Sequence, residues 1–477
     1  MESVPGRFLG KNKEMKIFFI NPPARVQRRE EVVVPPLGLA YLAAIAERDG
    51  HRVQILDAFA RGMSWGEFEK EIKAEKPDLV GIGGMTPTID STLRAIRICR
   101  PHTQTIVMGG PHFSVFKDEF FRVCPELDYG IVGEGERSFA LLLKNIHEGI
   151  TPEAVPGLLS RGGIANPVED FIPHLDEIPF PARHLLPNEA YRYALWPGKK
   201  ITTFITSRGC PYHCIFCEKS IFGSRWRPRS PQNVLAEMEQ IVKKQRIRSI
   251  ILYDDLFTLQ KQRVIEICKG ILERELKFEW KCEGRVDRVD EEMLRWMKKA
   301  GCTLIAYGVE SGNQIGLDYL QKGINLAQIR DAFQTTRRAG IRPMAYFILG
   351  IPVETFEQGL RTIEFARELN PDYAQFSVLS PFKGTPLYEE AMEKGWYREV
   401  NAQNPFDKDR KRPVLASRNW SDRSLQEILR IAHRRFYFRP SYILKRIKNV
   451  RSLREVHSLC GVGRGLLQWY WSKGGPI

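Results

Sequence analysis

The sequence predicts two α/β domains, joined by a proline-rich segment and followed by a basic helical segment. The 477 residues suffice for two or three domains. Two long series of short apolar runs alternate with helical patterns, which favours parallel sheets covered by helices. No apolar run reaches the roughly 20 residues that a membrane span needs. The predicted divisions are residues 1–148, a linker 149–197, residues 198–390 and a C-terminal segment 391–477.

In the first domain, five predicted strands alternate with four predicted helices, a pattern typical of a doubly wound parallel sheet. The strands are Lys16–Ile20, Val53–Leu56, Leu79–Ile82, Thr105–Met108 and Tyr129–Val132. The helices are Leu37–Arg48, Trp65–Glu75, Thr88–Arg100 and Ser138–Glu148. Ligands bind such sheets at the carboxyl ends of the strands. We therefore expect a ligand site among the residues that follow these strands.

Glycine and proline are frequent at these strand ends, where they allow a ligand to approach the backbone closely. No G-x-G-x-x-G opens the first helix and no Walker lysine loop is present, which argues against dinucleotide and nucleotide binding. His112 lies on this edge as either a ligand contact or a turn residue. The candidate binding residues are Pro22, Pro23, Met85, Thr86, Gly109, Gly110, His112, Gly133, Glu134, Gly135 and Glu136.

The linker is rich in proline, which predicts an extended connector with few regular elements. Its apolar residues alternate with prolines in Leu175–Pro181, so we expect it to pack in the cleft between the domains.

The second domain contains six predicted strand–helix units, which indicates a partial α/β barrel. The strands are Ile201–Ile205, Ser249–Tyr253, Phe278–Cys282, Leu304–Gly308, Pro343–Ile348 and Tyr373–Val378. The helices are Asn233–Lys244, Lys261–Glu273, Glu291–Lys299, Leu326–Ala339 and Thr355–Leu369. Barrel chemistry occurs at the C-terminal ends of the strands. There the candidates are Asp254, Asp255, Glu283, Arg285, Glu310, Ser311, Gly350, Ser380 and Lys383.

A three-cysteine loop, Cys210-Pro-Tyr-His-Cys214-Ile-Phe-Cys217, follows the first of these strands. Thiolates are the ligands that iron–sulfur clusters and soft metals favour. A closed structural zinc site needs four ligands, whereas a 4Fe–4S cluster held by three thiolates keeps one iron open. The alternative is a zinc site completed by His213 or by a distant cysteine.

The distribution of charge and of cysteine along the chain indicates the cellular compartment and the binding partners to expect. The other six cysteines are scattered, and the N-terminus lacks the apolar core of a signal peptide, so we expect a reducing cytoplasm. The net charge is 72 − 57 = +15, and residues 408–464 carry most of the excess. This segment and the apolar end Leu466–Trp471 suggest a basic helical cap on the barrel or a peripheral contact with an anionic inner-membrane face. No RNA-binding signature is present, so nucleic acid is not expected.

The cysteine loop is the signature of radical S-adenosylmethionine (SAM) enzymes, and the chain resembles the large subclass that carries a cobalamin-binding domain. One departure is the absence of the D-x-H-x-x-G motif that supplies an axial histidine elsewhere, which is usual in this subclass. A further motif, Phe436–Pro440, resembles proteins near the anaerobic magnesium-protoporphyrin monomethyl ester cyclase and the hopanoid and bacteriochlorophyll methylases. The first-domain motifs that carry the resemblance are Asn21–Pro23, Pro35–Ala43, Gly109–His112 and Gly133–Glu136.

The resemblance implies a flavodoxin-like cobalamin domain and a partial (β/α)6 TIM-type barrel with a helical C-terminal segment. It implies a 4Fe–4S cluster on Cys210, Cys214 and Cys217, whose open iron chelates SAM. Phe216 then flanks the adenine, while Asp254 and Asp255 approach the amino group. Glu310 and Ser311 approach the ribose and methionine. At the same C-terminal end of the barrel strands, Glu283 would accept hydrogen bonds from SAM, and Arg285 would bind a carboxylate.

The implied function is a methyltransferase that acts on an unactivated carbon through a 5′-deoxyadenosyl radical and methylcobalamin. The alternatives are a cyclase, oxidase or rearrangement enzyme with the same cofactors, an RNA-modifying radical SAM enzyme, and a regulatory corrin-binding protein. The RNA alternative is disfavoured because the first domain lacks three further cysteines at cluster spacing. The expected partners are a sizeable, lipid-like or tetrapyrrole substrate and a flavodoxin- or ferredoxin-type electron donor.

Overall fold

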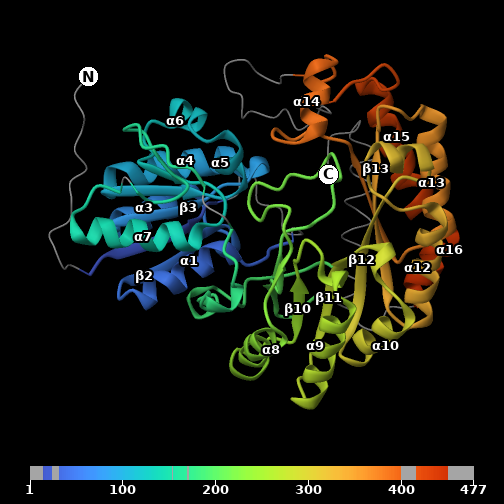
Figure 1. The fold of residues 1–477 in the computed structure, drawn as a ribbon, viewed down its shortest axis with the longest axis horizontal. Helices are drawn as coiled ribbons and strands as arrows, with labels where there is room; N and C mark the ends of the chain where they lie inside the picture. Colours follow the sequence, from blue (N-terminus) through green and yellow to red (C-terminus); the bar gives the residue numbers. More distant parts are fainter. Residues whose placement is uncertain (1–13, 24–31, 153, 169–170, 399–414, 449–477) are drawn as a thin grey trace. The chain divides into compact units, whose positions relative to one another are not determined.

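The computed structural model divides the chain into two units (Figure 1). Unit 1 comprises the described residues up to Tyr193 together with Lys219–Arg229, and unit 2 comprises Ala194–Glu218 and the described residues from Ser230 onward. The described part of the predicted linker up to Tyr193 thus belongs to unit 1, and the described residues after 390 belong to unit 2. The structure describes residues 14–23, 32–152, 154–168, 171–398 and 415–448.

Unit 1 contains a sheet with the strand order β2-β1-β3-β4-β5-β6, in which the first five strands are parallel and β6 is antiparallel to β5. This is the flavodoxin-like order that was predicted. The sequence analysis missed β6, which has three residues and lies in the proline-rich segment. The strands are β1 (Lys16–Asn21), β2 (Arg52–Asp57), β3 (Leu79–Gly83), β4 (Thr105–Gly109), β5 (Tyr129–Ile131) and β6 (Leu158–Ser160).

Helices cover the sheet of unit 1, with α1 beside α7 and α3 beside α4 (Figure 1). A capping box between Ser64 and Glu67 begins α3. The helices α2, α5 and α6 were not predicted, because they have six residues or fewer and show no clear periodicity. The helices are α1 (Leu37–Arg48), α2 (Ala58–Arg61), α3 (Trp65–Glu75), α4 (Ile89–Cys99), α5 (Pro111–Phe116), α6 (Glu119–Val123) and α7 (Gly135–Glu148).

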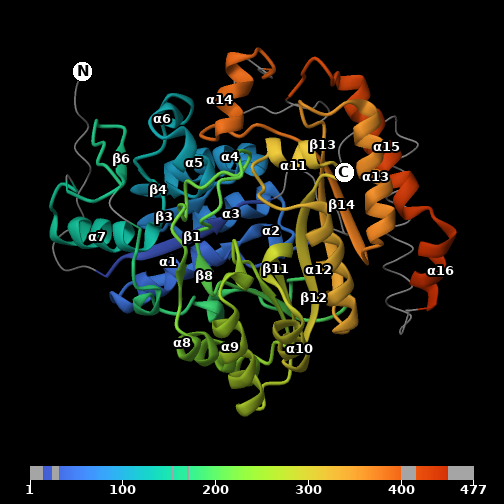
Figure 2. The same cartoon turned by 45° about the vertical axis from the view of Figure 1, so that its right-hand side comes forward.

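Unit 2 contains six parallel strands in sequential order, from β7 at one edge to β14 at the other, as predicted for a partial (β/α)6 barrel. Figure 2 labels the last four of them, β11 to β14. All six carboxyl ends therefore meet at one rim. The strands are β7 (Ile201–Phe204), β10 (Ser249–Leu252), β11 (Glu279–Gly284), β12 (Cys302–Glu310), β13 (Arg342–Leu349) and β14 (Tyr373–Val378). Two-residue strands are β8 (Ser207–Arg208) in unit 2 and β9 (Arg227–Pro228) in unit 1.

The helices of unit 2 pack their apolar sides onto these strands and form one large buried core. A π-helix, Gln240–Lys244, extends α8. The short α11 and α14 were not predicted. The helices are α8 (Pro231–Glu239), α9 (Lys261–Glu273), α10 (Glu291–Lys299), α11 (Gln314–Tyr319), α12 (Leu326–Arg338), α13 (Phe356–Leu369) and α14 (Pro386–Glu393).

The C-terminal helices α15 (Asp422–Tyr437) and α16 (Pro440–Lys448) follow the barrel. Helix α15 packs on α13 and on the edge strand β14 (Figure 2). Phe436 and Tyr442 are buried in the barrel core, and the Tyr442 hydroxyl donates to a backbone carbonyl at 3.1 Å. These aromatic residues thus cap the barrel. The apolar end Leu466–Trp471 lies outside the described residues. Across the described ranges, no helix has both the length and the apolar character needed to cross a membrane.

Candidate functional site

The three cysteines predicted to bind a cluster lie on the loop after β7 and β8, at the carboxyl rim of the barrel. The Arg285 guanidinium, at the end of β11, lies 3.5 Å from the ring centroid of Tyr212 in this loop. The backbone N–H of Ile215 donates to the carbonyl of Leu320 at 3.2 Å. The first two thiols are half-buried and the third is exposed. The loop is thus fixed to the barrel while its thiols stay accessible.

Burial separates these three thiols from the other cysteines of the described chain. Desolvation raises the pKa of Cys99 and that of Cys124 to about 12, and burial also raises the pKa of Cys268 and Cys282. Because a metal binds the thiolate, the buried cysteines are poor ligands and the loop thiols are suitable ones.

The thiols of the loop have the chemistry that an iron–sulfur cluster needs. In such a cluster, each protein thiolate binds a different iron. The donor set and its accessibility therefore fit a cluster held by three thiolates.

Two acidic residues at the end of β10 hold the chain that enters the cluster loop. The buried Asp254 carboxylate accepts hydrogen bonds from the Thr206 N–H at 2.7 Å and from the Thr206 and Ser207 hydroxyls at 2.5 Å. Burial raises the pKa of Asp254, and these hydrogen bonds oppose that effect. A cofactor contact was predicted for Asp254, whereas in the structure its carboxylate accepts hydrogen bonds from this turn. The exposed Asp255 accepts from the Gly209 N–H at 2.9 Å.

A buried lysine beside the cluster loop was missed by the sequence analysis. Lys322 Nζ lies 2.7 Å from Glu310 Oε1, and the two side chains are 11% and 7% exposed. Burial acts to lower the pKa of Lys322, but the charges of Glu310 and Cys214 outweigh it and raise the pKa. Gly308 packs against this pair, because a Cβ there would lie 2.3 Å from Glu310 Oε1 and 2.6 Å from Lys322 Nζ and would displace the ends of both side chains. Glu310 is therefore paired with a cation next to Cys214.

The other charged residues predicted at the carboxyl ends of the barrel strands also have partners of opposite charge. Lys281 Nζ lies 2.8 Å from Glu283 Oε1 at the end of β11. Arg285 Nε lies 2.8 Å from Asp287 Oδ1, and Arg285 Nη2 donates to the carbonyl of Lys322 at 2.8 Å. The strand ends thus bring Glu283, Arg285 and Glu310 to one rim, as predicted, within a network of ion pairs that holds their side chains.

Ser311 belongs to a buried network around Glu354, which the sequence analysis did not identify. The Ser311 hydroxyl donates to Glu354 Oε1 at 2.5 Å and accepts from the Asn313 N–H at 2.9 Å. The other carboxyl oxygen, Glu354 Oε2, has no hydrogen-bond partner among the described residues. Burial raises the pKa of Glu354 to about 7, against the hydrogen bonds from Ser311 and Asn313. The Glu354 carboxyl group therefore holds the turn after β12 through these hydrogen bonds.

We expect the ionisation of Glu354 to lower the free energy of unfolding as the pH rises. Burial raises its pKa from the 4.5 of an ordinary glutamate to about 7 in the fold, so the native state binds the proton more tightly than the unfolded state. Its contribution is complete below pH 4.5 and is lost as the pH rises through about 7, a change of about 3 kcal/mol. Urea unfolding at pH 5 and pH 8 measures this loss.

The Glu354→Gln variant should abolish most of this pH dependence, because the amide keeps the shape and does not ionise. The exposed Glu357 on the same segment provides the matched control, and Glu357→Gln should retain the wild-type pH dependence. Equal pH slopes in wild type and Glu354→Gln would contradict the assignment.

The ligand edge of unit 1 is built from two hydrogen-bonded loops. The Gly84 N–H donates to the carbonyl of Gly109 at 3.0 Å, and the His112 N–H donates to that of Gly84 at 3.1 Å. Met85 is 55% exposed although it is apolar. The His112 ring is buried, with Nδ1 3.1 Å from the Thr86 hydroxyl. A glycine-lined edge with an exposed apolar side chain fits a large flat ligand such as a corrin.

A buried polar cluster closes the ends of β1 and β2, and the sequence analysis did not anticipate it. Asp57 Oδ1 accepts from Asn21 Nδ2 at 2.8 Å, and Asp57 Oδ2 accepts from the Tyr191 hydroxyl at 2.9 Å. Burial raises the pKa of Asp57, and these hydrogen bonds oppose that effect. Pro22 and Pro23, which follow Asn21, are buried. The predicted linker, through Tyr191, thus stabilises this edge.

The motif Gly133–Glu136 follows β5, and its acidic side chains are turned into unit 1. The Glu134 side chain is 4% exposed, and its Oε2 lies 2.8 Å from Arg227 Nη1. Glu136 is also buried. A ligand at this edge would therefore meet the backbone of the motif rather than these two carboxylates.

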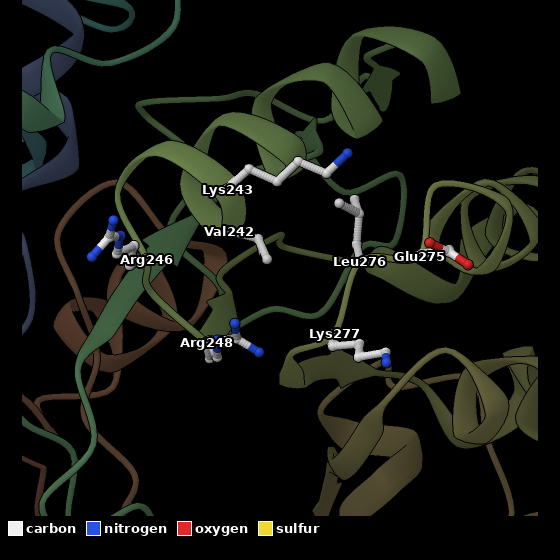
Figure 3. Close-up of a pocket in the computed structure, with 7 residues that line it drawn as sticks. All are labelled: Val242, Lys243, Arg246, Arg248, Glu275, Leu276 and Lys277. Carbon is white, nitrogen blue, oxygen red and sulfur yellow. The ribbon is translucent and has the colours of Figure 1, made fainter.

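A cavity of about 420 Å³ lies at the amino ends of β10 and β11, on the barrel end opposite the cluster loop (Figure 3). Barrel enzymes place their chemistry at the carboxyl ends of the strands, and none of the predicted site residues lines this cavity. Its lining residues are Val242, Lys243, Arg246, Arg248, Glu275, Leu276 and Lys277.

Comparison with known proteins agrees with this geometry. The family model for the radical SAM superfamily matches residues 204–366, and the model for the B12 binding domain matches residues 29–143. An uncharacterized methyltransferase of Pyrococcus horikoshii is 34% identical over 96% of this chain and 99% of its own length. The anaerobic magnesium-protoporphyrin IX monomethyl ester cyclase of Rubrivivax gelatinosus is 30% identical over 80% of this chain and 70% of its own length.

A solved structure supports the fold. The radical SAM methyltransferase TsrM from Kitasatospora setae, with cobalamin and a [4Fe–4S] cluster bound, superposes with a TM-score of 0.68 at 22% identity, over 82% of this chain and 76% of that one. The predicted fold class and family are confirmed, and the cluster reading replaces the zinc alternative. The chain belongs to the radical SAM family with a B12-binding domain, as an enzyme that uses a 4Fe–4S cluster, SAM and cobalamin.

Proposed function

We propose that this enzyme methylates an unactivated carbon of a sizeable, largely apolar substrate. The observation that carries the proposal is the accessible three-thiol loop at the barrel rim, in a chain that also has a B12-binding domain. The nearly full-length similarity to a protein named as a methyltransferase supports it. When bound, the cofactors would supply a 5′-deoxyadenosyl radical from SAM and a methyl group from methylcobalamin.

In unit 2, we assign the loop thiols of Cys210, Cys214 and Cys217 to the cluster. The residues around them would hold SAM. Arg285 is held by Asp287 and by the carbonyl of Lys322, and its proposed role is to attract the SAM carboxylate through its positive charge. The further SAM contacts proposed are Phe216, Asp255, Glu283, Glu310 and Ser311.

In unit 1, we assign the glycine-lined edge to the corrin. Backbone hydrogen bonds join the loops after β3 and β4. These loops would therefore hold the cofactor in one orientation through their backbone. The proposed contacts are Met85, Thr86, Gly109, Gly110, Gly133 and Gly135.

The second candidate function is a cyclisation or oxidation with the same cofactors and no net methyl transfer. The 30% identity to an anaerobic magnesium-protoporphyrin cyclase favours it, and it shares the expectation of a tetrapyrrole or lipid-like substrate. Either reaction would need a low-potential electron donor of the flavodoxin or ferredoxin type, because SAM cleavage at the cluster consumes an electron.

SAM that carries a deuterated methyl group separates the two candidates. The anaerobically reconstituted enzyme, with hydroxocobalamin and a reductant, would be incubated with lipid and tetrapyrrole extracts. Methylation predicts 5′-deoxyadenosine together with an apolar product that is heavier by a deuterated methyl group. Product formation with 5′-deoxyadenosine and without the label would replace the methyltransferase proposal with the second candidate.

A further inference from the structure

The chain that leaves the cluster loop is part of the other unit. Cys217 is the last cluster cysteine and belongs to unit 2, yet Lys219–Arg229, which begins two residues later, belongs to unit 1. The covalent chain therefore carries any displacement of this segment directly to the cluster loop. What fixes the segment inside unit 1 is consequently relevant to the cluster.

Arg227 fixes this segment through a buried ion pair. Its Nη1 lies 2.8 Å from Glu134 Oε2 and donates to the carbonyl of Ile172 at 2.6 Å. Its Nη2 donates to the carbonyl of Phe222 at 2.9 Å, and the guanidinium lies 5.0 Å from the ring centroid of Phe171. The Arg227 and Glu134 side chains are 3% and 4% exposed. A buried pair with so many contacts has one well-defined geometry.

The surroundings of the pair are packed closely enough to transmit a displacement. Glu134 Oε2 also accepts the N–H of Ile172 at 2.8 Å, so one carboxylate oxygen holds both Ile172 and Arg227. Gly223 in the same segment has a φ of 71°, and a Cβ there would lie 2.3 Å from the Phe171 ring. The segment therefore rests directly on an aromatic face next to the ion pair.

Glu134 belongs to the edge that we assign to the corrin. It is the N-cap residue of α7, between Gly133 and Gly135, and the Gly133 N–H donates to the Ser114 hydroxyl at 3.0 Å. A corrin lying on this backbone would fix its conformation and, with it, the Glu134 carboxylate. Because the carboxylate holds Arg227, the chain leaving the cluster loop would be fixed as well.

We infer that Arg227 and Glu134 are positioning residues that couple corrin binding in unit 1 to the order of the cluster loop, and hence to SAM binding. Coupling of this kind is reciprocal: the corrin tightens SAM binding by the same factor by which SAM tightens corrin binding. The inference rests on the proposed cofactor sites and adds an energetic link between them.

The test is the dissociation constant of SAM with and without hydroxocobalamin. Equilibrium dialysis with labelled SAM on the anaerobic, cluster-loaded protein measures it without turnover. In the wild type, we expect saturating hydroxocobalamin to tighten SAM binding by about fivefold or more. In Arg227→Met and in Glu134→Gln, we expect this ratio to fall close to one, while each cofactor still binds.

Glu134→Gln and one control variant, Arg225→Met, keep the test decisive. Glu134→Gln is isosteric and remains informative if Arg227→Met does not fold. Arg225 is exposed and lies two residues from Arg227, so Arg225→Met removes the same charge and should keep the wild-type ratio. A wild-type ratio near one, an unchanged ratio in Glu134→Gln, or a ratio lost in Arg225→Met would overturn the inference. A wild type that binds no hydroxocobalamin would overturn the proposed corrin site itself.

Discussion

Replacing Cys214 with alanine is expected to abolish SAM cleavage. Cys214 is one of three accessible thiols on the loop, and the other cysteines of the described chain are buried, so no neighbouring thiol replaces it. We expect the reconstituted variant to lose the 4Fe–4S signal in its absorbance and electron paramagnetic resonance spectra. Formation of 5′-deoxyadenosine should fall by about a thousandfold or more, which corresponds to about 4 kcal/mol.

His213 is the matched control, because it is exposed and directly adjacent to Cys214. His213→Ala should keep its iron content, its spectra and its SAM cleavage within about twofold of wild type. Near-normal SAM cleavage by Cys214→Ala would contradict the cluster assignment, and loss of bound metal in His213→Ala would favour a site in which the histidine is a ligand.

The sequence predicts those elements of this fold that carry a strong local signal. Helices α1, α3, α9 and α10 begin and end at the predicted residues, because their apolar periodicity is sustained over two or more turns. Short elements such as α5 and β6 have no such signal, since a few residues show neither period clearly. Parallel pairing in each sheet followed from the alternation of strands and helices, whereas the flavodoxin-like strand order was implied by the family resemblance.

The candidate site was only partly predictable, for a different reason. The strand-end rule placed Glu283, Arg285 and Glu310 at one rim, and the structure brings them there. It could not identify Lys322 or Glu354, because their importance depends on partners 12 and 43 residues away in the chain. The sequence pattern likewise does not show that these two charged side chains are buried.

The same limit explains the residues whose environment differs from expectation. Asp254 and Glu134 stand at strand ends as exposed binding residues would. In the structure, however, their carboxylates hold Thr206 and Arg227, respectively. Whether a strand-end carboxylate meets a ligand or the protein itself depends on which donors the neighbouring loops present, and these loops come from distant parts of the chain.

Replacing Lys322 with methionine should destabilise unit 2 strongly. Methionine has nearly the length and volume of the lysine stem, so packing changes little, but the largely buried Glu310 carboxylate loses its cation. Removing one partner of a buried ion pair costs about 3–5 kcal/mol, because an uncompensated charge remains in the interior. Urea unfolding of the reconstituted protein measures this loss.

The double variant Lys322→Met/Glu310→Gln separates loss of the charge pair from loss of packing. With both charges removed, the buried carboxylate penalty disappears, so the double variant should regain most of the stability that Lys322→Met loses. Lys394→Met is the matched control, since Lys394 forms a pair with Glu390 but its side chain is 48% exposed, and it should cost less than about 1 kcal/mol. If Lys322→Met lowers the free energy of unfolding no more than Lys394→Met does, the ion pair between Lys322 and Glu310 contributes little to stability. Hydrogen bonds such as those of Ser311, and not this ion pair, would then stabilise the rim of the barrel.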